Sequence, residues 1–474
     1  MPLTGRRKFL AGLTGIGLGG VLCRGGLDGQ TQPIAFAGVT VIEGTERPPM
    51  SGMTVVISGD RIRTLGLAGK TSAPKGARLI DARDKFLLPG LWDMHVHGDV
   101  RDLYPVFIAH GVTGVRIMSG LPHHRQWRKE IAGGKLIGPR LVVASPILNG
   151  PNNYWGKPDG TWSLVENPEQ GRAAVRNAIR LGSDFIKVYE SLNRDSYFAI
   201  ADEAKKRRIP FVGHVPELIW AAEASAVGQK SIEHLTGILM SCSTAGAAWM
   251  KERIAAKTPA EAPRAPNFPT TINTFSESLA ADLFAVFRKN RTWQCPTMTV
   301  LQSSLGWSPD NPGLKYVPRT NRERWTHDLD TELKAATAAR KAFLQRADER
   351  FLSIIGEMHR KGIGILAGTD TPNPWCIPGY GLHEELEHLV RAGLTPLASL
   401  RAATYGPAEF LGKLDTLGTV EQGKIADLVL LDANPLDDIA NTRKIQAVVS
   451  RGRLFERPAL DAMLRRVEAV ADAN

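Results

Sequence analysis

Six side chains that could bind metal ions occur at widely separated points of the chain, each at or near the end of a short apolar run. They are His95, His97, Lys187, His214, His234 and Asp370. Alternate side chains of a strand share a face, so His95 and His97 are expected to project together and could hold one metal ion. Because a His-x-His pair also occurs by chance, the pair alone is a weak signal.

Lys187 is unusual because it is a charged residue inside the apolar run Phe185-Ile186-Lys187-Val188-Tyr189. An unpaired ammonium in a buried parallel strand is energetically costly. Taken alone, Lys187 is best explained as a snorkelling lysine or as the partner of Glu190 in a salt bridge. Taken with the histidines, it is a candidate metal ligand.

A change of sequence pattern after Pro89-Gly90 predicts the elements that carry these residues. Apolar runs of five to nine residues alternate with longer helical patterns, which is typical of βα units and a parallel sheet. The predicted strands are Leu91 to His97, Thr113 to Ser119, Arg140 to Leu148, Phe185 to Tyr189, Pro210 to Val215, Ser231 to Leu235, Thr292 to Thr299 and Gly364 to Asp370. Eight such runs predict an α/β fold with a (β/α)8 TIM barrel.

The spacing of the six residues is compatible with one site. The 92 residues from His95 to Lys187 correspond to three βα units of about 31 residues each, a normal repeat for such a barrel. Single units separate Lys187 from His214 and His214 from His234. The long interval from His234 to Asp370 corresponds to two units plus insertions, predicted over residues 236–291 and 300–330 as helical segments or lids. The six residues would then lie on strands 1, 4, 5, 6 and 8, at the catalytic face.

Short β-rich runs flank the predicted barrel on both sides. Before it lie Ile34 to Ile42, Met53 to Ser58, Arg61 to Leu65 and Arg78 to Asp81, and after it lie Gly423 to Leu431 and Ala447 to Gly452. These runs predict a small β-sandwich in two halves, residues 31–88 and 415–457. The barrel, residues 89–414, would be inserted between them, and residues 458–474 would form a C-terminal helix.

Composition excludes several classes of protein. The chain has 474 residues, 43% hydrophobic and 23% charged, so it can bury a sizeable interior and is not disordered overall. No stretch is apolar for long enough to span a bilayer. The net charge is +11, but the basic residues are scattered and not interleaved with aromatics, which argues against a nucleic-acid groove. The four cysteines are far apart, which argues against a disulfide framework or a zinc-thiolate site.

The first residues resemble a bacterial twin-arginine export signal. Arg6-Arg7 precedes Phe9-Leu10 and a glycine-rich, weakly apolar run that extends to Cys23. The alternative is an N-terminal amphipathic helix, which the glycines in that run disfavour. Residues 1–30 are therefore expected to be removed after export, leaving a periplasmic or secreted protein without stable membrane insertion.

Taken together, five motifs resemble the amidohydrolase superfamily, in its binuclear branch that includes prolidase-like and imidazolonepropionase-related enzymes. The motifs are Asp93-Met94-His95-Val96-His97, Ile186-Lys187-Val188-Tyr189, Gly213-His214, Ile232-Glu233-His234-Leu235 and Gly368-Thr369-Asp370. The resemblance extends to Leu88-Pro89-Gly90-Leu91-Trp92 and to Gly423-Lys424-Ile425-Ala426-Asp427, so it covers nearly the whole mature chain.

The resemblance implies a centre of two divalent metal ions, with zinc the expected metal. Lys187 would be carboxylated by carbon dioxide and its carbamate would bridge the two ions. His95, His97 and Asp370 would hold one ion, and His214 and His234 the other. A bridging hydroxide would be the nucleophile, and Asp370 would accept its proton and return it to the leaving nitrogen.

Four further residues are candidates for substrate contact. Tyr189 follows Lys187 on the same strand face, His123 and His124 follow the second predicted strand, and Tyr154 follows the third. All four would lie at the barrel's active face. The alternative for Tyr189 is a core aromatic, and for Tyr154 a packed loop.

These features predict a metal-dependent hydrolase that cleaves the amide bond of a dipeptide or an N-acyl amino acid. The alternative within the same chemistry is a cyclic amide, lactone or phosphotriester hydrolase, because the same hydroxide could attack all three. A catalytically inactive binding protein is disfavoured, since all six metal positions hold competent residues. The expected partner is a small-molecule substrate and not a nucleic acid. Family members often form homo-oligomers, but the sequence determines no oligomeric state.

Overall fold

The computed structural model describes residues 32–98, 100–151, 153, 157–255, 266–302, 311–335 and 337–473. The predicted export signal and the candidate Tyr154 lie outside these ranges. The described part is a mixed α/β structure, with one largely antiparallel sheet and two parallel sheets.

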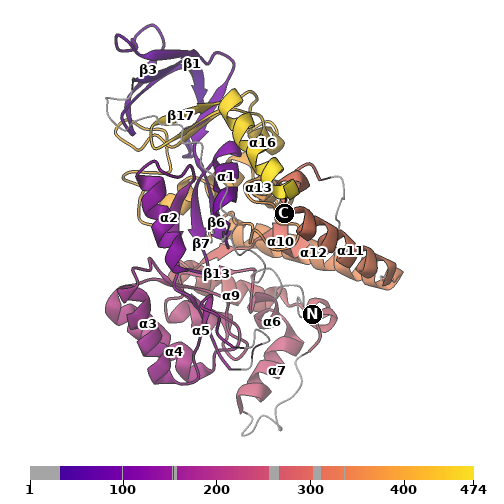
Figure 1. Ribbon diagram of the computed structural model, residues 1–474. Coiled ribbons are helices and arrows are strands. Elements are labelled where there is room, and N and C mark those ends of the chain that lie inside the picture. Colours follow the sequence, from indigo (N-terminus) through magenta and orange to yellow (C-terminus); the bar gives the residue numbers. More distant parts are fainter. Residues whose placement is uncertain are drawn as a thin grey trace.

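The first sheet combines strands from both ends of the chain. It has eight strands in the order β17-β16-β15-β5-β1-β2-β3, with β4 also paired to β1. Their bounds are β1 (Ile34–Val41), β2 (Met50–Ser58), β3 (Arg61–Leu67), β4 (Arg78–Asp81), β5 (Phe86–Pro89), β15 (Leu428–Leu431), β16 (Ile445–Ser450) and β17 (Arg453–Glu456). Strand β15 pairs antiparallel with β5, so the two terminal regions meet in one sheet, as Figure 1 shows.

The sequence located most of these strands but not all. The four predicted N-terminal runs correspond to β1 to β4, whereas β5 and β17 were not predicted. Both missed strands are four residues long, too short to show a distinct alternation of polar and apolar residues. Buried side chains of this sheet, among them Phe36, Val55, Leu87 and Leu430, form their own apolar core.

The central strands are parallel. One sheet has the order β6-β7-β8 and the other the order β10-β9-β11-β12-β13-β14. Their bounds are β6 (Leu91–Val96), β7 (Val112–Ile117), β8 (Arg140–Val143), β9 (Ile147–Asn149), β10 (Trp162–Leu164), β11 (Ile186–Val188), β12 (Phe211–Gly213), β13 (Ser231–Glu233) and β14 (Trp293–Cys295).

Isolated parallel bridges join the two parallel sheets. Ala144 pairs with Phe185, Gln294 with Ile365, and Val96 with Thr371. The amide of Met94 also donates to the carbonyl of Ala367, at 2.9 Å. Residues 364–371 therefore lie between β14 and β6, at the position expected for the last strand.

Three predicted strands were wrong in extent. The run Gly364 to Asp370 forms only the isolated bridges and not a strand, and its last residue has a positive φ of 62°. The run Thr292 to Thr299 ends as a strand at Cys295, because α10 (Met298–Leu301) begins after Thr297. The run Arg140 to Leu148 is divided between β8 and β9, where Pro146 has no amide to donate.

Most of the helices connect successive parallel strands, and α13, α14 and α15 follow residues 364–371 and lead back to β15 of the first sheet. Their bounds are α1 (Tyr104–Ala109), α2 (Pro122–Ala132), α3 (Pro168–Arg180), α4 (Arg194–Arg207), α5 (Ala221–Ala226), α9 (Glu277–Asn290), α13 (Tyr380–Arg391), α14 (Pro396–Ala402) and α15 (Tyr405–Phe410). Asn167, Asn193 and Ser276 cap the N-termini of α3, α4 and α9 through their side-chain oxygens.

The described parts of the two predicted insertions are largely helical. They contain α6 (Ile238–Ser241), α7 (Thr244–Ala255), α8 (Phe268–Asn273), the 3-10 helix η4 (Leu314–Tyr316) and α11 (Arg319–Ala335). The second insertion was predicted to end at residue 330, but α11 begins at Arg319, directly after Pro318, and continues past that boundary. Helix α12 (Ala338–Arg360) follows, and α11 and α12 extend away from the parallel strands in Figure 1.

The final helix, α16 (Arg457–Ala473), packs on α1 near the first sheet (Figure 1). Within the described ranges, no helix combines the length and the apolar character needed to cross a membrane.

Asp427 connects the first sheet to the parallel strands. Its carbonyl accepts a hydrogen bond from Gly90, which separates β5 from β6. Its carboxylate accepts bonds from the amide of Arg451, at 2.6 Å, and from Nε of Arg140 on β8, at 2.5 Å. The side chains of Asp427 and Arg140 are only 4% and 18% exposed, so the ion pair is largely removed from water.

We expect Asp427→Ala to lower the free energy of unfolding by about 3 kcal/mol, because it leaves the Arg140 guanidinium without its counterion. Urea denaturation followed by circular dichroism measures this. Asp81→Ala is the matched control, because Asp81 pairs with Arg83 where both side chains are largely exposed. Equal unfolding midpoints for the two variants would show that the Asp427 ion pair does not hold the sheet to the parallel strands.

Candidate metal centre

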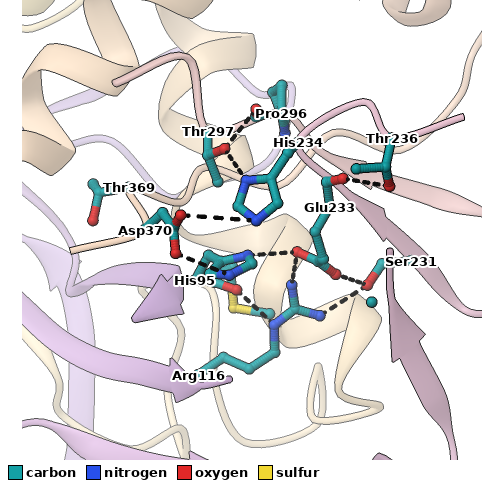
Figure 2. A network of polar contacts seen from close by, with 12 residues as sticks. His95, Arg116, Ser231, Glu233, His234, Thr236, Pro296, Thr297, Thr369 and Asp370 are labelled. Atoms are coloured by element: carbon teal, nitrogen blue, oxygen red, sulfur yellow. Dashed lines mark hydrogen bonds and ion pairs between the residues drawn. The ribbon is translucent and has the colours of Figure 1, made fainter. Parts of the chain in front are cut away.

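Three histidines surround the carboxylate of Asp370, and Figure 2 shows two of them, His95 and His234. Nε2 of His95 and Nε2 of His97 lie 3.3 and 3.2 Å from Oδ1 of Asp370. Nε2 of His234 lies 3.9 Å from the other oxygen, Oδ2, too far for a hydrogen bond. Residues predicted on three different strands are therefore brought to one point.

The electrostatics of this cluster favour neutral imidazoles at His95 and His234 and an ionised carboxylate at Asp370. Burial lowers the pKa of His95 and of His234 well below the ordinary histidine value, and the Lys187 ammonium lowers both pKa values further. Burial alone would raise the pKa of Asp370, but the imidazoles of His234, His95 and His97 hold it well below its usual range. Neutral imidazole and ionised carboxylate are the forms that bind metal ions.

Glu233 fixes the orientation of His95 by contacting Nδ1, the ring nitrogen that does not face Asp370. Nδ1 of His95 lies 2.9 Å from Oε2 of Glu233, and the same oxygen accepts a 2.7 Å bond from the guanidinium of Arg116. Arg116 also donates to the carbonyl of Met94 and to Oγ of Ser231. Because Oε2 of Glu233 accepts from the Arg116 guanidinium and also faces Nδ1 of His95, Nδ1 carries the proton, and Nε2 presents its lone pair toward Asp370.

Sequence reasoning did not identify Arg116 or Glu233 as site residues. The same signal that singled out Lys187 could have found Arg116, which is a charged residue in the apolar run Gly114-Val115-Arg116-Ile117. All atoms of Arg116 and Glu233 are shielded from solvent, so each requires the other as a counterion.

Lys187 is fully buried on β11. Its backbone amide donates to Oγ of Ser145, at 3.0 Å. A side chain at Gly213, on neighbouring β12, would meet Cδ of Lys187 at 3.1 Å and the carbonyl oxygen of Val188 at 2.2 Å. Glycine at 213, which has a φ of +133°, therefore leaves the space that the lysine chain occupies.

His214 stands beside His234, with 4.8 Å between the ring centroids. Its Nδ1 lies 2.8 Å from Oε1 of Glu190, another carboxylate behind an imidazole that sequence reasoning did not place there. The ring of Tyr189 stacks on His214 at 4.0 Å, and Tyr189 is only 3% exposed. Tyr189, a candidate for substrate contact, is thus packed against a predicted metal ligand.

The turn that presents Asp370 is tied to β6 by Asp93. The carboxylate of Asp93 accepts bonds from the amide and the hydroxyl of Thr369, at 3.1 and 2.7 Å. A side chain at Gly368 would meet Sγ of Cys295 at 2.6 Å and Cβ of His95 at 2.9 Å. The Gly368-Thr369-Asp370 motif therefore permits the close approach that puts the carboxylate beside His95.

Two other candidates lie at the start of α2. His124 is fully buried, and its Nε2 and Nδ1 bond the carbonyl of Gly98 and the amide of Leu121, respectively. The ring of His123 stacks on Trp127, with 4.4 Å between centroids. His124 therefore ties α2 to the loop after β6.

The side chains fit a metal ion. One ligand atom from each of His95, His97 and Asp370 lies within 4.8 Å of the other two. His95, Glu233 and Cys295 also meet this distance criterion, but Glu233 is already engaged by Arg116 and by Nδ1 of His95. Two imidazoles and a carboxylate suit zinc and related divalent ions.

Comparisons with known proteins agree with this geometry. The model of the amidohydrolase family matches residues 86–455. An Aspergillus niger protein named ochratoxinase is 24% identical over 499 residues, which cover 90% of this chain and 87% of that protein.

Solved structures share the fold. Bottromycin amidohydrolase superposes with a TM-score of 0.73 and 22% identity, over 93% of this chain and 90% of that structure. A Xaa-Pro dipeptidase with bound methionine in the active site gives a TM-score of 0.63 and 20% identity, over 90% of this chain and 100% of that structure. The resemblance inferred from the motifs is confirmed. Because the family model spans well over half of its length, the chain belongs to the amidohydrolase family.

Proposed function

We propose that this hydrolase cleaves the amide C–N bond of a dipeptide or an N-acyl amino acid, at a centre of two divalent metal ions, with zinc as the metal. The observation that carries the proposal is the group of three imidazoles around the buried Asp370 carboxylate, with Lys187 buried close enough to influence two of them.

We further infer that the parallel strands close into a (β/α)8 barrel. The bridges of Val96 with Thr371, Gln294 with Ile365 and Ala144 with Phe185 support closure, because they join β8 to the start of β11 and, through residues 364–371, β14 to β6. In a closed barrel the C-terminal ends of all the strands meet at one face. His97, Lys187, His214, His234 and Asp370 would then share that face.

In this proposal His95, His97 and Asp370 hold one ion and His214 and His234 the other, with the carboxylated form of Lys187 between them. Carboxylation by carbon dioxide converts a costly buried cation into an anionic ligand. Two bound divalent cations supply Lewis-acid polarisation of the scissile carbonyl and a water molecule of lowered pKa.

Carboxylate side chains of the protein orient the metal ligands and transfer protons. Glu233 and Glu190 hold the distal nitrogens of His95 and His214. Asp370 is ionised at neutral pH, because neighbouring imidazoles lower its pKa, so it can accept a proton from water. Its carboxyl then donates that proton to the departing nitrogen, which leaves as a neutral amine.

The substrate class is supported from two sides. The Xaa-Pro dipeptidase that shares the fold acts on an acyclic amide by its name, and the chain's net charge of +11 suits substrates that carry a carboxylate. We also propose that Arg6-Arg7 directs the folded protein through the twin-arginine route to the periplasm or outside the cell.

We expect turnover of an acyclic amide by the protein supplied with zinc or manganese and bicarbonate. Mass spectrometry of a mixture of dipeptides, N-acyl amino acids, cyclic amides and lactones would identify the product amine. Lys187→Ala and chelation should each abolish the release, because each removes part of the metal centre. Turnover confined to rings or esters would contradict the proposed substrate class, and unchanged turnover in Lys187→Ala would contradict the metal centre.

We expect Glu233→Gln to weaken metal binding by about 10- to 100-fold, because the neutral amide no longer fixes the proton of His95 on Nδ1. Competition with a chelating indicator measures the affinity. Glu203→Gln is the control, since Glu203 is also a buried carboxylate, with its side chain 7% exposed, and pairs with Arg207 on α4 away from the metal centre. Equal affinity in both variants would show that Glu233 does not support the metal ligand.

A further inference from the structure

Four residues at or next to the candidate metal centre have strained backbone conformations. His234, Leu235, Thr297 and Asp370 all have a positive φ, of 58°, 54°, 51° and 62° respectively. A positive φ is uncommon for residues other than glycine, and it is a pronounced outlier for a β-branched residue such as threonine. Such conformations persist where the surrounding structure enforces them, and they concentrate at functional sites.

Among these four, Thr297 has no role in the metal centre described so far, yet it contacts His234 directly. Its Oγ1 lies 2.6 Å from Nδ1 of His234, and its hydroxyl donates to the carbonyl of Pro296, at 2.7 Å (Figure 2). Thr297 is fully buried, so water does not compete for these bonds.

The two bonds of Thr297 determine the proton position on His234. A threonine hydroxyl has one hydrogen, and here the carbonyl of Pro296 accepts it. The oxygen can therefore only accept from His234, so Nδ1 carries the proton. Nε2, the nitrogen proposed to bind a metal ion, then presents its lone pair on the side of the ring that faces Asp370, whose Oδ2 lies 3.9 Å away.

A carboxyl on α13 holds the strained loop in place. Helix α10 begins directly after Thr297, and both the amide and the hydroxyl of Thr299 bond Oε2 of Glu385, at 2.8 and 2.9 Å. Glu385 is fully buried. These two hydrogen bonds hold α10 against α13 and so keep Thr297 in its left-handed conformation next to His234.

We propose that Thr297 is a positioning residue for the metal centre, one that fixes the tautomer and the orientation of His234 through its hydroxyl. This inference rests on the proposed function, because it assigns His234 as a metal ligand. It assigns to His234 the support that Glu233 gives to His95 and Glu190 gives to His214, but with a neutral hydroxyl in place of a carboxylate.

The chain offers a matched control in a second threonine–histidine pair. Oγ1 of Thr442 lies 2.9 Å from Nδ1 of His383 and 2.8 Å from the carbonyl oxygen of Ile439. Both residues are buried, as Thr297 is, whereas the side chain of His234 is 9% exposed. His383 bonds the carbonyl of His110 through Nε2, so it is no part of the metal centre.

The test compares metal binding in the whole protein and in four variants, Thr297→Val, Thr297→Ser, Thr297→Ala and Thr442→Val. Titration with zinc against a chelating indicator gives the dissociation constants, and the visible spectrum of the cobalt(II)-loaded protein reports the ligand geometry. Thr297→Val removes the hydroxyl and keeps the branched shape, and Thr297→Ser keeps the hydroxyl. Thr297→Ala is the second variant without a hydroxyl, should valine prevent folding.

We expect Thr297→Val and Thr297→Ala to weaken one of two zinc sites by about 10- to 100-fold and to change the cobalt spectrum. Thr297→Ser and Thr442→Val should keep both constants within about threefold of the wild-type values.

Unchanged zinc affinity in Thr297→Val and Thr297→Ala would overturn the inference. An equal loss of zinc affinity in Thr297→Ser would also overturn it, because that variant keeps the hydroxyl and changes only the shape of the side chain. An equal loss of zinc affinity in Thr442→Val would overturn it as well, because it would show that removing a buried threonine hydroxyl anywhere in the fold weakens metal binding. A wild-type protein that binds no divalent ion would instead contradict the proposed function, and the inference with it.

Discussion

The buried ion pair between Arg116 and Glu233 is the interaction on which the rest of the site depends. Two unlike charges shielded from water are stable only when they are close and their remaining hydrogen-bonding atoms are satisfied. Here Arg116 bonds Glu233, Ser231 and the carbonyl of Met94. The second lone pair on Oε2 of Glu233 is then available to His95, so a structural ion pair also sets the proton position of a metal ligand.

The same arrangement recurs around the centre with different partners. Three of the four imidazoles proposed as metal ligands, those of His95, His214 and His234, have an oxygen next to Nδ1, from Glu233, Glu190 and Thr297 respectively. These oxygens come from β13, from the end of β11 and from the turn before α10. The metal centre is therefore held by the packing of several elements, and its ligands need little rearrangement to bind a cation.

Part of this could be predicted from sequence, because metal ligands at strand ends leave a local pattern. Parallel strands bring their carboxyl ends to one face, so His95, His97, His234 and Asp370 could be placed together from their spacing. Arg116 was detectable as a charged residue in an apolar run. Thr297 and Glu190 were not, because their contacts depend on turn geometry and on side chains far away in the sequence.

Contacts between residues far apart in the sequence also explain why the ends of two strands were predicted wrongly. The runs that end at Thr299 and Asp370 look apolar and β-rich, yet both turn into left-handed conformations that bring Thr297 and Asp370 to the site. Local propensity favours a strand there, and the contacts of Thr299 with Glu385 and of Thr369 with Asp93 override it.

The most direct measurement of the central claim is ¹³C nuclear magnetic resonance of the protein loaded with zinc in the presence of ¹³C-bicarbonate. We expect one labelled carbamate carbonyl per chain, two bound zinc ions, and loss of the labelled signal in Lys187→Gln. Two bound zinc ions without a labelled carbonyl, or a signal that persists in Lys187→Gln, would show that Lys187 does not bridge the ions and would contradict the proposed centre.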